Sequence, residues 1–443
     1  MSSIINSTTS PEWTRADLPR QLMVRVLGEV MFWLVIMQLV AGAYLQSQFA
    51  LFDGQLRLSN GVPKMLLVLN VVMLATGAVV MHRGRIPMRR CMFPACLFSL
   101  YLIIDLAFLL ATSSREPGAV IFGFNKYFMF FSVIPAAAVL RPVLTDRQMQ
   151  ARLLILLVPL AALALTQYIV NDPLLVIRSE ENQFEIPAVE FYGQTRAFSL
   201  FRGVLECGQG MAFFGALLIA RLFVDRRRHL LLNMGLLLLT AATCYVTFRR
   251  GAYMEYGAAA IAATVISMRS SLSRWLPWGF LLFGIVVAVG GPLLGSVSGD
   301  GVLSSESLEE RHGAWGEAIE VWMLKGGLAP LLGTGLAQIE ESAPDYFLVD
   351  NGFLAVGAQI GLIGVSLLIW VMLSLYRDML QTGWQTNSAL PMAVAALFST
   401  WMMRSMFDPL FALYPLYAFL AFWAIYSVKP SRATVVWNRQ VTR

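Results

Sequence analysis

The stretch from 230 to 268 decides the fold, and it reads LLLNMGLLLLTAATCYVTFRRGAYMEYGAAAIAATVISM. It is mostly apolar on both sides of the pair Arg249-Arg250. A helix of about 20 apolar residues crosses the core of a bilayer, so the stretch is too long for one span and suits two. We therefore predict two transmembrane helices joined by a tight turn at Gly251, with both arginines at one membrane surface.

The whole chain has the composition of a polytopic membrane protein. Of its 443 residues, 57% are hydrophobic and 14% are charged, and the mean hydropathy is +0.65. A soluble protein carries about 25% charged residues, so this composition excludes an ordinary soluble class. Apolar runs long enough to span a membrane occur at 26–46, 64–81, 92–112, 124–140, 153–171, 205–222, 230–248, 251–268, 275–294, 352–376, 388–404 and 409–427. The sequence thus predicts an all-α fold of about twelve transmembrane helices, which form one membrane-embedded domain over residues 1–443.

Basic residues mark every second connection between these runs. They are His82-Arg83-Gly84-Arg85 with Arg89-Arg90, Arg141 with Arg147 and Arg152, Arg226-Arg227-Arg228, Arg269 with Arg274, Arg377, and the tail residues Lys429, Arg432, Arg439 and Arg443. By the positive-inside rule these connections and both termini face the cytoplasm. The first apolar run is too long for a removed signal peptide and lacks a small-residue cleavage site, so we expect it to be retained as the insertion signal.

Two long polar connections, 172–204 and 295–350, fall on the opposite side, and both are rich in glutamate. The net charge of +6 is therefore a topology signal and does not indicate nucleic-acid binding. The second loop contains the pattern of an amphipathic helix. Ser307 and Glu310 form a possible capping box, Gly326-Gly327 provides a stop, and one apolar face is formed by Leu308, Trp315, Ile319 and Trp322.

The sequence gives little support for a metal, a cofactor or a disulfide framework. The cysteines Cys91, Cys96, Cys207 and Cys244 all lie in or beside predicted spans. The three histidines are scattered over both faces, and the carboxylates do not cluster at metal-ligand spacing. We therefore expect chemistry that uses no metal and no cofactor.

Several arginines fall on the predicted outer face, and each has an ordinary explanation beside a functional one. Arg249 and Arg250 could reach lipid phosphates, or they could face a polar cavity. Arg404 lies one helical turn before Asp408, so a local ion pair competes with a binding role. Arg311 is on the inward face of the predicted loop helix, where it could pair with a nearby glutamate or bind an anion.

The order of short motifs resembles a known family. The motifs are Arg196-Ala197-Phe198-Ser199, Phe248-Arg249-Arg250-Gly251-Ala252, Arg311-His312-Gly313-Ala314-Trp315, Pro330-Leu331-Leu332-Gly333-Thr334-Gly335 and Val349-Asp350-Asn351-Gly352-Phe353-Leu354. Together with the twelve-span layout, this succession resembles the bacterial O-antigen polymerase and ligase superfamily, Wzy-type polymerases included. The resemblance covers most of the chain and is strongest from 190 to 376.

The resemblance implies an inner-membrane glycosyltransferase that acts at the periplasmic face. Such an enzyme moves a glycan from undecaprenyl pyrophosphate to an acceptor sugar. By position, Arg250 matches the arginine of the family's Ser-Arg-Gly-Ala-like turn, while Arg196 and Arg311 match arginines of the two outer loops. The ligases usually have His-Asn where this chain has Asp350-Asn351, a form closer to the polymerases. The departure leaves the identity of the base open.

Physical reasoning supplies roles for these residues. Departure of a lipid pyrophosphate develops negative charge, which converging arginines stabilise without a metal. The candidates for pyrophosphate binding are Arg196, Arg249, Arg250, Arg311 and Arg404, of which Arg250 and Arg311 are also catalytic candidates. Asp350 is the candidate base for the attacking hydroxyl, with Glu206 and His312 in reserve. Alternatively, Asp350 caps the next helix together with Asn351. We expect Trp315 and Asn351 to contact the glycan.

The favoured interpretation is a polymerase that joins lipid-linked oligosaccharide repeat units into a surface polysaccharide or exopolysaccharide. Its expected partners are a chain-length regulator and a flippase. One alternative is a ligase that transfers the glycan to a lipid A core or to protein. An alternative from another class is a membrane transporter or flippase, because twelve spans with intramembrane arginines suit that class too. No clear repeat relates the two halves of the chain, which speaks against a transporter.

Overall fold

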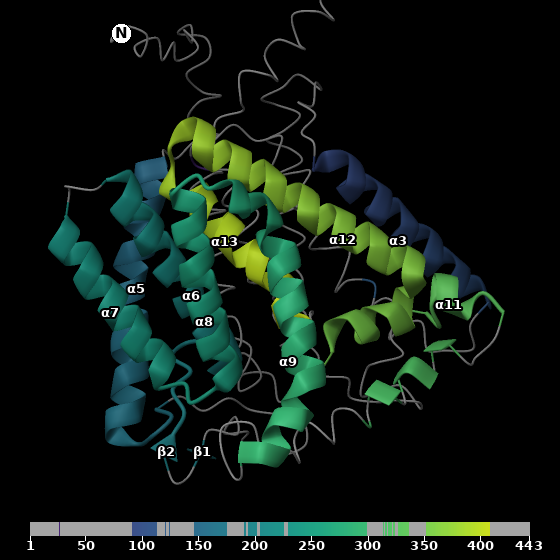
Figure 1. The fold of residues 1–443 in the computed structure, drawn as a ribbon, viewed down its shortest axis with the longest axis horizontal. Helices are drawn as coiled ribbons and strands as arrows, with labels where there is room; N and C mark the ends of the chain where they lie inside the picture. Colours follow the sequence, from purple (N-terminus) through teal and green to yellow (C-terminus); the bar gives the residue numbers. More distant parts are fainter. Residues whose placement is uncertain are drawn as a thin grey trace, which may run out of the picture.

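A computed structural model describes residues 26, 91–112, 120, 124, 146–174, 190–191, 194–201, 204–225, 229–298, 313, 315–316, 318–320, 322–323, 327–335 and 351–407. Within these residues the chain is mostly helical, as predicted (Figure 1). The predicted spans 26–46, 64–81, 124–140 and 409–427 lie outside the described residues, apart from Val26 and Phe124.

The other predicted spans all coincide with helices. These are α3 (Met92–Thr112), α5 (Asp146–Val170), α6 (Val204–Val224), α7 (Leu230–Tyr245), α8 (Arg250–Ser267), α9 (Leu276–Ser298), α12 (Gly352–Thr386) and α13 (Ala389–Arg404). A 3-10 helix, η2 (Ser271–Trp275), precedes α9. Five segments within the described residues are helical, long and apolar enough to cross a membrane: Met92–Ala111, Asp146–Val170, Val204–Val224, Ser271–Ala288 and Gly352–Thr386.

A small hairpin interrupts the helical pattern in the first polar connection. Strand β1 (Glu190–Phe191) pairs antiparallel with β2 (Gln194–Thr195), with Glu190 opposite Thr195. The hairpin is drawn below the ends of α5 and α8 in Figure 1. The chain is therefore not purely helical in its described part, although the hairpin is too short to change the fold class.

The junction of α7 and α8 differs from the predicted turn at Gly251. Helix α7 ends at Tyr245, and the chain reverses over Val246 to Arg249 before α8 begins at Arg250. Phe248 adopts a left-handed backbone conformation with φ 47°, and Thr247 Oγ1 donates to the carbonyl of Cys244 at 2.7 Å. The turn therefore precedes Gly251, which lies within the first turn of α8. The prediction of two helices that meet at Arg249-Arg250 is confirmed. The predicted position of the turn, at Gly251, was wrong.

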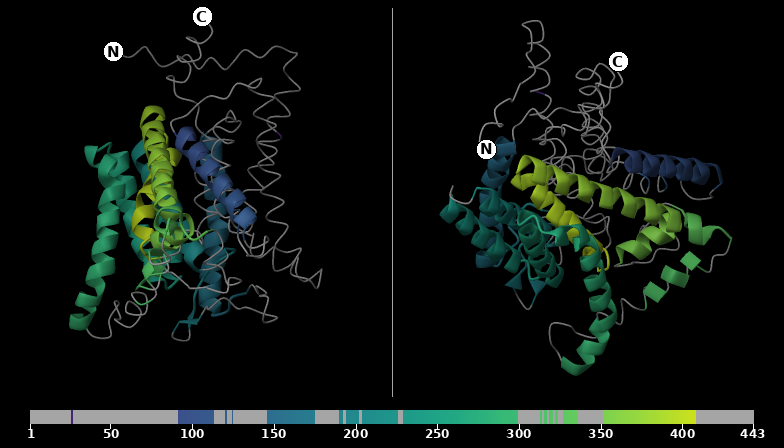
Figure 2. Two further views of the ribbon diagram at one scale, coloured as in Figure 1. Left: turned by 90° about the vertical axis from the view of Figure 1, so that its right-hand side faces the viewer. Right: turned by 45° about the horizontal axis from the view of Figure 1, so that its top comes forward.

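Helix α13 lies at the centre of the bundle. All of its residues from Ala389 to Arg404 are buried, and it contacts α6, α8, α9 and α12. Small residues bring α6 and α8 close together, because a side chain at Gly208 would overlap Ala252 and one at Gly215 would meet the ring of Tyr256. Such small-residue contacts are the usual means by which helices approach closely in membranes. Figures 1 and 2 show α13 enclosed between these neighbours.

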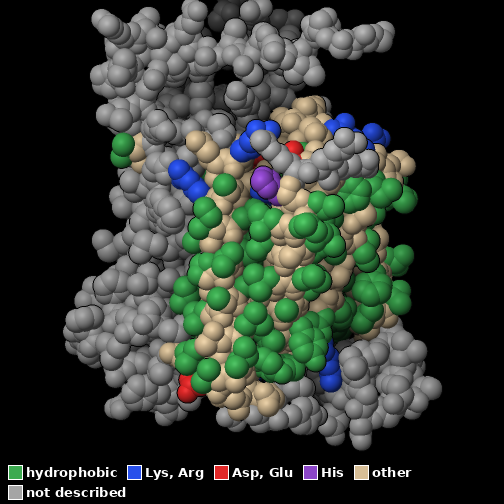
Figure 3. All heavy atoms as spheres, turned by 90° about the vertical axis from the view of Figure 1, so that its left-hand side faces the viewer, with side chains coloured by type: hydrophobic (Ala, Val, Ile, Leu, Met, Phe, Trp, Pro, Cys, Tyr) green, Lys and Arg blue, Asp and Glu red, His purple; other side chains and the backbone are tan. Residues whose placement is uncertain are grey.

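The outer surface of the bundle has the pattern expected of a lipid-facing protein. Large apolar side chains are exposed along several helices, for example Leu231 and Leu238 on α7, Ile261 on α8 and Leu282 on α9. Figure 3 shows a continuous belt of hydrophobic side chains, with charged side chains gathered towards the two ends. A belt of this kind matches a hydrocarbon core between two polar interfaces.

The helix ends alternate in space as the basic connections predict. At one end, here called the Arg249 end, the rings of Tyr168 and Phe248 lie 5.7 Å apart, and Gly352 N donates to the carbonyl of Ser405 at 2.7 Å. At the other, here called the Arg269 end, Arg269 donates to Asn387 Oδ1 at 3.0 Å. Among the described helices, the ends of α5, α7 and α13 and the starts of α8 and α12, all predicted to face outward, thus lie at the Arg249 end.

Candidate functional site

The junction of α7 and α8 places two arginines at the Arg249 end. Arg249 is the N-cap residue of α8 and is half-buried, whereas Arg250 is the first helical residue and is exposed. Aromatic rings support the junction: Tyr245 stacks on Tyr253 at 6.1 Å, and the Tyr253 hydroxyl donates to the Tyr245 carbonyl at 2.6 Å. The backbone at Arg249 is therefore held by contacts on both helices.

A segment of the first polar connection brings Arg196 to the same junction. The next residue, Ala197, donates its N–H to the carbonyl of Val246 at 3.0 Å. Gln167 on α5 orders the following residues, because its Oε1 accepts from the N–H groups of Phe198 at 3.1 Å and Ser199 at 2.8 Å. The buried Gln167 amide thus fixes the loop that carries Arg196.

Arg196 and Arg249 influence each other electrostatically. Partial burial and the neighbouring charge of Arg249 lower the pKa of the Arg196 guanidinium, while Tyr253 acts in the opposite direction. Two like charges held together by ordered backbone raise the local positive potential. This arrangement suits an anionic ligand, and the planar guanidinium groups can each donate two parallel hydrogen bonds to a phosphate.

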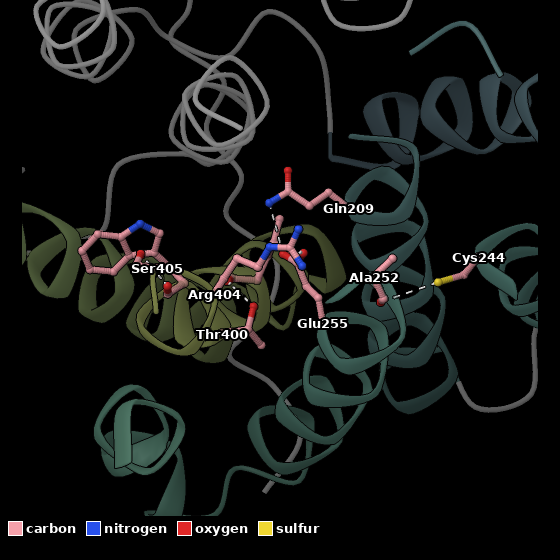
Figure 4. A network of polar contacts seen from close by, with 9 residues as sticks. Gln209, Cys244, Ala252, Glu255, Thr400, Arg404 and Ser405 are labelled. Atoms are coloured by element: carbon pink, nitrogen blue, oxygen red, sulfur yellow. Dashed lines mark hydrogen bonds and ion pairs between the residues drawn. The ribbon is translucent and has the colours of Figure 1, made fainter. Parts of the chain in front are cut away.

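Arg404 takes a different position, in the interior of the bundle. Its Nε lies 3.6 Å from Glu255 Oε2, and Glu255 Oε1 accepts from Gln209 Nε2 at 3.2 Å (Figure 4). The side chains of Arg404 and Glu255 are 3% and 0% exposed. We expected Arg404 either to bind pyrophosphate or to pair with Asp408, which lies outside the described residues. The partner that the structure gives it is Glu255 on α8.

Sequence reasoning missed Glu255 and Gln209. Glu255 is a lone carboxylate within the apolar run 251–268, and such residues usually face a polar interior or an ionic partner. That signal was present in the sequence. Gln209 carried a weaker one, because an amide on a membrane helix often serves only to bond a neighbouring helix.

The start of α12 is the third element at this end. Asn351 is the N-cap residue, and its Oδ1 accepts from the N–H groups of Phe353 at 3.0 Å and Leu354 at 3.1 Å. Asn351 is buried, so its side chain serves the helix start. The predicted glycan contact of Asn351 stays a prediction. Asp350 lies outside the described residues, but the helix cap that we considered for it is provided by Asn351.

The second long connection is helical in its described residues between 313 and 323. Trp315 is half-buried and packs against Ala318 and Ala355, and the buried Trp322 lies against Gly357 of α12. The predicted amphipathic helix therefore packs through Trp315 and Trp322. Ile319, which the sequence groups with Trp315 and Trp322 on one face, is 44% exposed, whereas its neighbour Ala318 is buried. Arg311 and His312 lie outside the described residues.

Helix α12 is broken at Gly361, where φ is 66° and ψ is −177°. Gly333 (φ 84°), which follows the short helix α11 (Ala329–Leu332), lies directly against this break. A side chain at either glycine would overlap backbone atoms of the facing segment. Only glycine tolerates both the left-handed backbone and the close approach. Figure 1 shows the short first part of α12 turning away from the long part.

Groups outside α12 satisfy the carbonyls that the break releases. Thr334 N and Oγ1 donate to the carbonyl of Ala358 at 2.8 and 2.7 Å, and Gly335 N donates to that of Gln359 at 3.0 Å. The Tyr101 hydroxyl of α3 donates to the carbonyl of Ile360 at 2.8 Å. Freed backbone groups in a membrane helix require such partners. The Gly333-Thr334-Gly335 motif thus supports the break in α12.

Within the described part of the chain, no group of three or more histidine, cysteine or acidic side chains is arranged to hold a metal ion. The four cysteines are free thiols there, and Cys96 is the exposed one. Comparison of the sequence with protein-family models and with curated proteins finds no match. The structure therefore brings Arg196 and Arg249 together, places Arg250 next to Arg249 at the start of α8, and buries Arg404 beneath the same helix turn in an ion pair with Glu255.

Proposed function

We propose that this chain is a membrane glycosyltransferase that extends a polysaccharide from lipid-linked oligosaccharide repeat units. The observation that carries the proposal is the meeting of Arg196 and Arg249 from separate segments at one end of an apolar helical bundle. The family resemblance of the surrounding motifs supplies the reaction. The proposed substrate is an undecaprenyl-pyrophosphate-linked oligosaccharide, whose lipid tail lies in the bilayer beside the helices.

In the proposed reaction, a hydroxyl oxygen of the acceptor sugar attacks the anomeric carbon of the donor glycan. The bond between that carbon and the pyrophosphate oxygen breaks, and the electron pair leaves with the lipid pyrophosphate. Arg196 and Arg249 stabilise the charge that develops on this leaving group, because preorganised donors act most strongly where charge appears in the transition state. Arg250 and Arg311 complete the arginine set in this proposal.

The acceptor hydroxyl must also lose its proton. We assign this role to Asp350, which directly precedes the helix cap Asn351 in the sequence. Glu206, at the start of α6, is the described reserve candidate, and His312 is the other. Trp315 and Asn351 are the proposed glycan contacts. The proposed site faces the periplasm from the bacterial inner membrane, with both termini in the cytoplasm.

The test is chain extension by purified protein supplied with a lipid-linked repeat unit in the presence of a chelator. We expect Arg196→Ala and Arg249→Ala each to lower the rate by about a hundredfold or more, because each removes a donor to the developing charge. Lysine should rescue poorly, since it loses the planar fork. The matched control is Arg269→Ala at the opposite end of the bundle, which should keep the wild-type rate. Full activity of both alanine variants would remove this pair from the mechanism.

A ligase differs from a polymerase only in its acceptor, so the same assay separates them. Long ladders from repeat units alone support the polymerase, whereas transfer that requires a lipid A core or a protein acceptor supports the ligase.

The break in α12 favours a second candidate, a transporter or flippase, because interrupted helices often line transport sites. In this chain the released carbonyls of Ala358, Gln359 and Ile360 accept hydrogen bonds from Thr334, Gly335 and Tyr101. Other groups of the protein thus already bind the carbonyls that a transported solute would need, which favours the enzyme over the transporter. Vesicles reconstituted with the protein would decide, since translocation of a lipid-linked glycan without chain extension would favour the transporter.

A further inference from the structure

The buried polar network of Gln209, Glu255 and Arg404 joins three helices at the Arg249 end. Gln209 comes from α6, Glu255 from α8 and Arg404 from the last residue of α13 (Figure 4). Arg404 and Glu255 are almost fully buried, and their ion pair brings two opposite charges together inside the bundle. Burying two charged side chains inside an apolar bundle costs free energy, so such residues usually have a functional role.

The network lies on a different face of α8 from Tyr253, which interacts electrostatically with Arg196. Residues four apart share a helix face, whereas residues two apart point to opposite sides. Gly251 and Glu255 therefore share one face, and Tyr253 points to the other. Arg404 Nη1 fills the space left at Gly251, because a Cβ atom there would lie 2.6 Å from it. The Arg404 guanidinium is thus enclosed beneath the first turn of α8.

The start of α12 contacts the same end of α13. The carbonyl of Ser405, the residue after Arg404, accepts from Gly352 N at 2.7 Å. The ring of Trp401 on α13 meets the ring of Phe353 on α12, with centroids 5.7 Å apart. A movement of the end of α13 would therefore move the first turn of α12. The ion pair between Arg404 and Glu255 in turn fixes the end of α13 to α8.

We propose that Arg404 and Glu255 are positioning residues and that Arg404 does not touch the substrate. Their ion pair sets the start of α8, which carries Arg249, relative to the start of α12, which carries Asn351. This inference rests on the proposed function for its catalytic consequence. It replaces the expected role of Arg404 as a pyrophosphate ligand with an indirect one.

A positioning role predicts that the helix arrangement and the rate of chain extension depend on the balance of the two buried charges more than on the presence of an arginine at 404. Glu255→Gln or Arg404→Gln alone leaves one buried charge without its partner, and the helix ends must then shift. A displacement of about 1 Å in an active site can lower a rate about a hundredfold. The double variant Glu255→Gln with Arg404→Gln removes both charges and leaves two amides that can hydrogen-bond to each other, so the arrangement should largely return.

The experiment uses the full-length protein with Cys96→Ser, so that its exposed thiol is removed. Cys244 then reports on the network without any activity, because it is buried and its Sγ lies 3.6 Å from the carbonyl of Ala252 on α8. We would measure labelling of Cys244 by N-ethylmaleimide, together with kcat and KM for chain extension. Arg269→Gln is the control for the loss of an arginine outside the network.

We expect each single variant to label about tenfold faster than the parent, because local opening exposes the thiol. We also expect each to lose about a hundredfold in kcat with little change in KM. The double variant should return close to the parent in both measurements. A double variant with parental labelling but the low kcat of Arg404→Gln would show that Arg404 acts on the substrate, which overturns the proposal.

Failure of the proposed function is distinguishable from failure of this inference. If the parent protein extends no chains, the polymerase proposal fails, and the labelling cycle alone decides the role of the pair. Fast labelling in both single variants and slow labelling in the double variant would still support the positioning role. Labelling that stays slow in the single variants, or stays fast in the double variant, would refute it.

Discussion

The two ends of the helical bundle place their arginines in different surroundings. At the Arg269 end, Arg269 donates to Asn387 Oδ1 at 3.0 Å, and Asp146 accepts from Gln150 at 2.6 Å and interacts with Arg221. At the Arg249 end, Arg196 and Arg249 come from separate segments and interact electrostatically. If the Arg269 end faces the cytoplasm, as proposed, its arginines follow from the positive-inside rule alone. In the same orientation Arg196 and Arg249 lie on the opposite side, where that rule does not account for them.

The Arg249 end also contains arginines in two different environments. Arg404 forms an ion pair with Glu255 in the interior of the bundle, whereas Arg196 and Arg249 are half-buried. Arg196 and Arg249 interact electrostatically, and two neighbouring guanidinium groups suit an anionic ligand. The pyrophosphate of the proposed lipid-linked substrate is such an anion.

The largest effect is expected from a test of orientation, because its result is all or none. Reporter domains fused after Arg227 and after Leu272 should be active only as cytoplasmic reporters, and fusions at Glu185 and Glu340 only as periplasmic ones. The reason is the alternation of basic connections along the chain. A cytoplasmic signal at Glu340 would place the Arg249 end in the cytoplasm. The positive-inside rule would then explain the arginines at both ends, and the substrate role of Arg196 and Arg249 would lose its support.

A smaller but still large effect is expected for Asp350→Asn. Asparagine keeps the size of the side chain but is not basic, so chain extension should fall by about a hundredfold to ten-thousandfold. Lipid-linked single repeat units should accumulate in cells. Because Asn351 already caps α12, loss of activity would not be explained by loss of a helix cap.

The matched control is Asp172→Asn at the same end. Asp172 Oδ1 accepts from Leu174 N at 2.6 Å, a bond that asparagine can keep. It should leave extension unchanged in the same assay, with a chelator present throughout. Substantial extension by Asp350→Asn would rule out Asp350 as the base.

The sequence could predict the helices because membrane spans are determined by local composition. The run 92–112 was predicted with the bounds that α3 has, and α7, α8 and α13 also lie close to their predicted ranges. Helix α12 extends ten residues beyond its predicted end at 376, to Thr386. Arg377 and Asp378 ended the apolar run, but polar residues do not end a helix once it has left the membrane.

The break in α12 could not be predicted, because it depends on contacts between distant segments. Gly361 lies in an apolar run where a glycine is compatible with an unbroken helix. Its left-handed backbone is stabilised by Gly333, Thr334 and Tyr101, which come from two other parts of the chain. The motif 333–335 was visible in the sequence, but its partner was not. In the same way, the family resemblance selected Arg196 and Arg250, and only the fold shows that Arg249 interacts with Arg196 and that Arg404 pairs with Glu255.

The smallest effect is expected at the Arg269 end, where a substitution should alter stability and leave activity unchanged. Asn387 ends α12 in a left-handed conformation with φ 49° and ψ 49°. Glycine takes this conformation readily, whereas alanine pays about 1 kcal/mol for it. Asn387→Gly should therefore melt close to the parent, because the hydrogen bond from Arg269 is exposed and contributes little. Asn387→Ala should lower the apparent melting temperature of the detergent-solubilised protein, and both variants should extend chains at the parental rate. If Asn387→Gly abolished extension, the Arg269 end would carry function as well, and the division between the two ends would have to be abandoned.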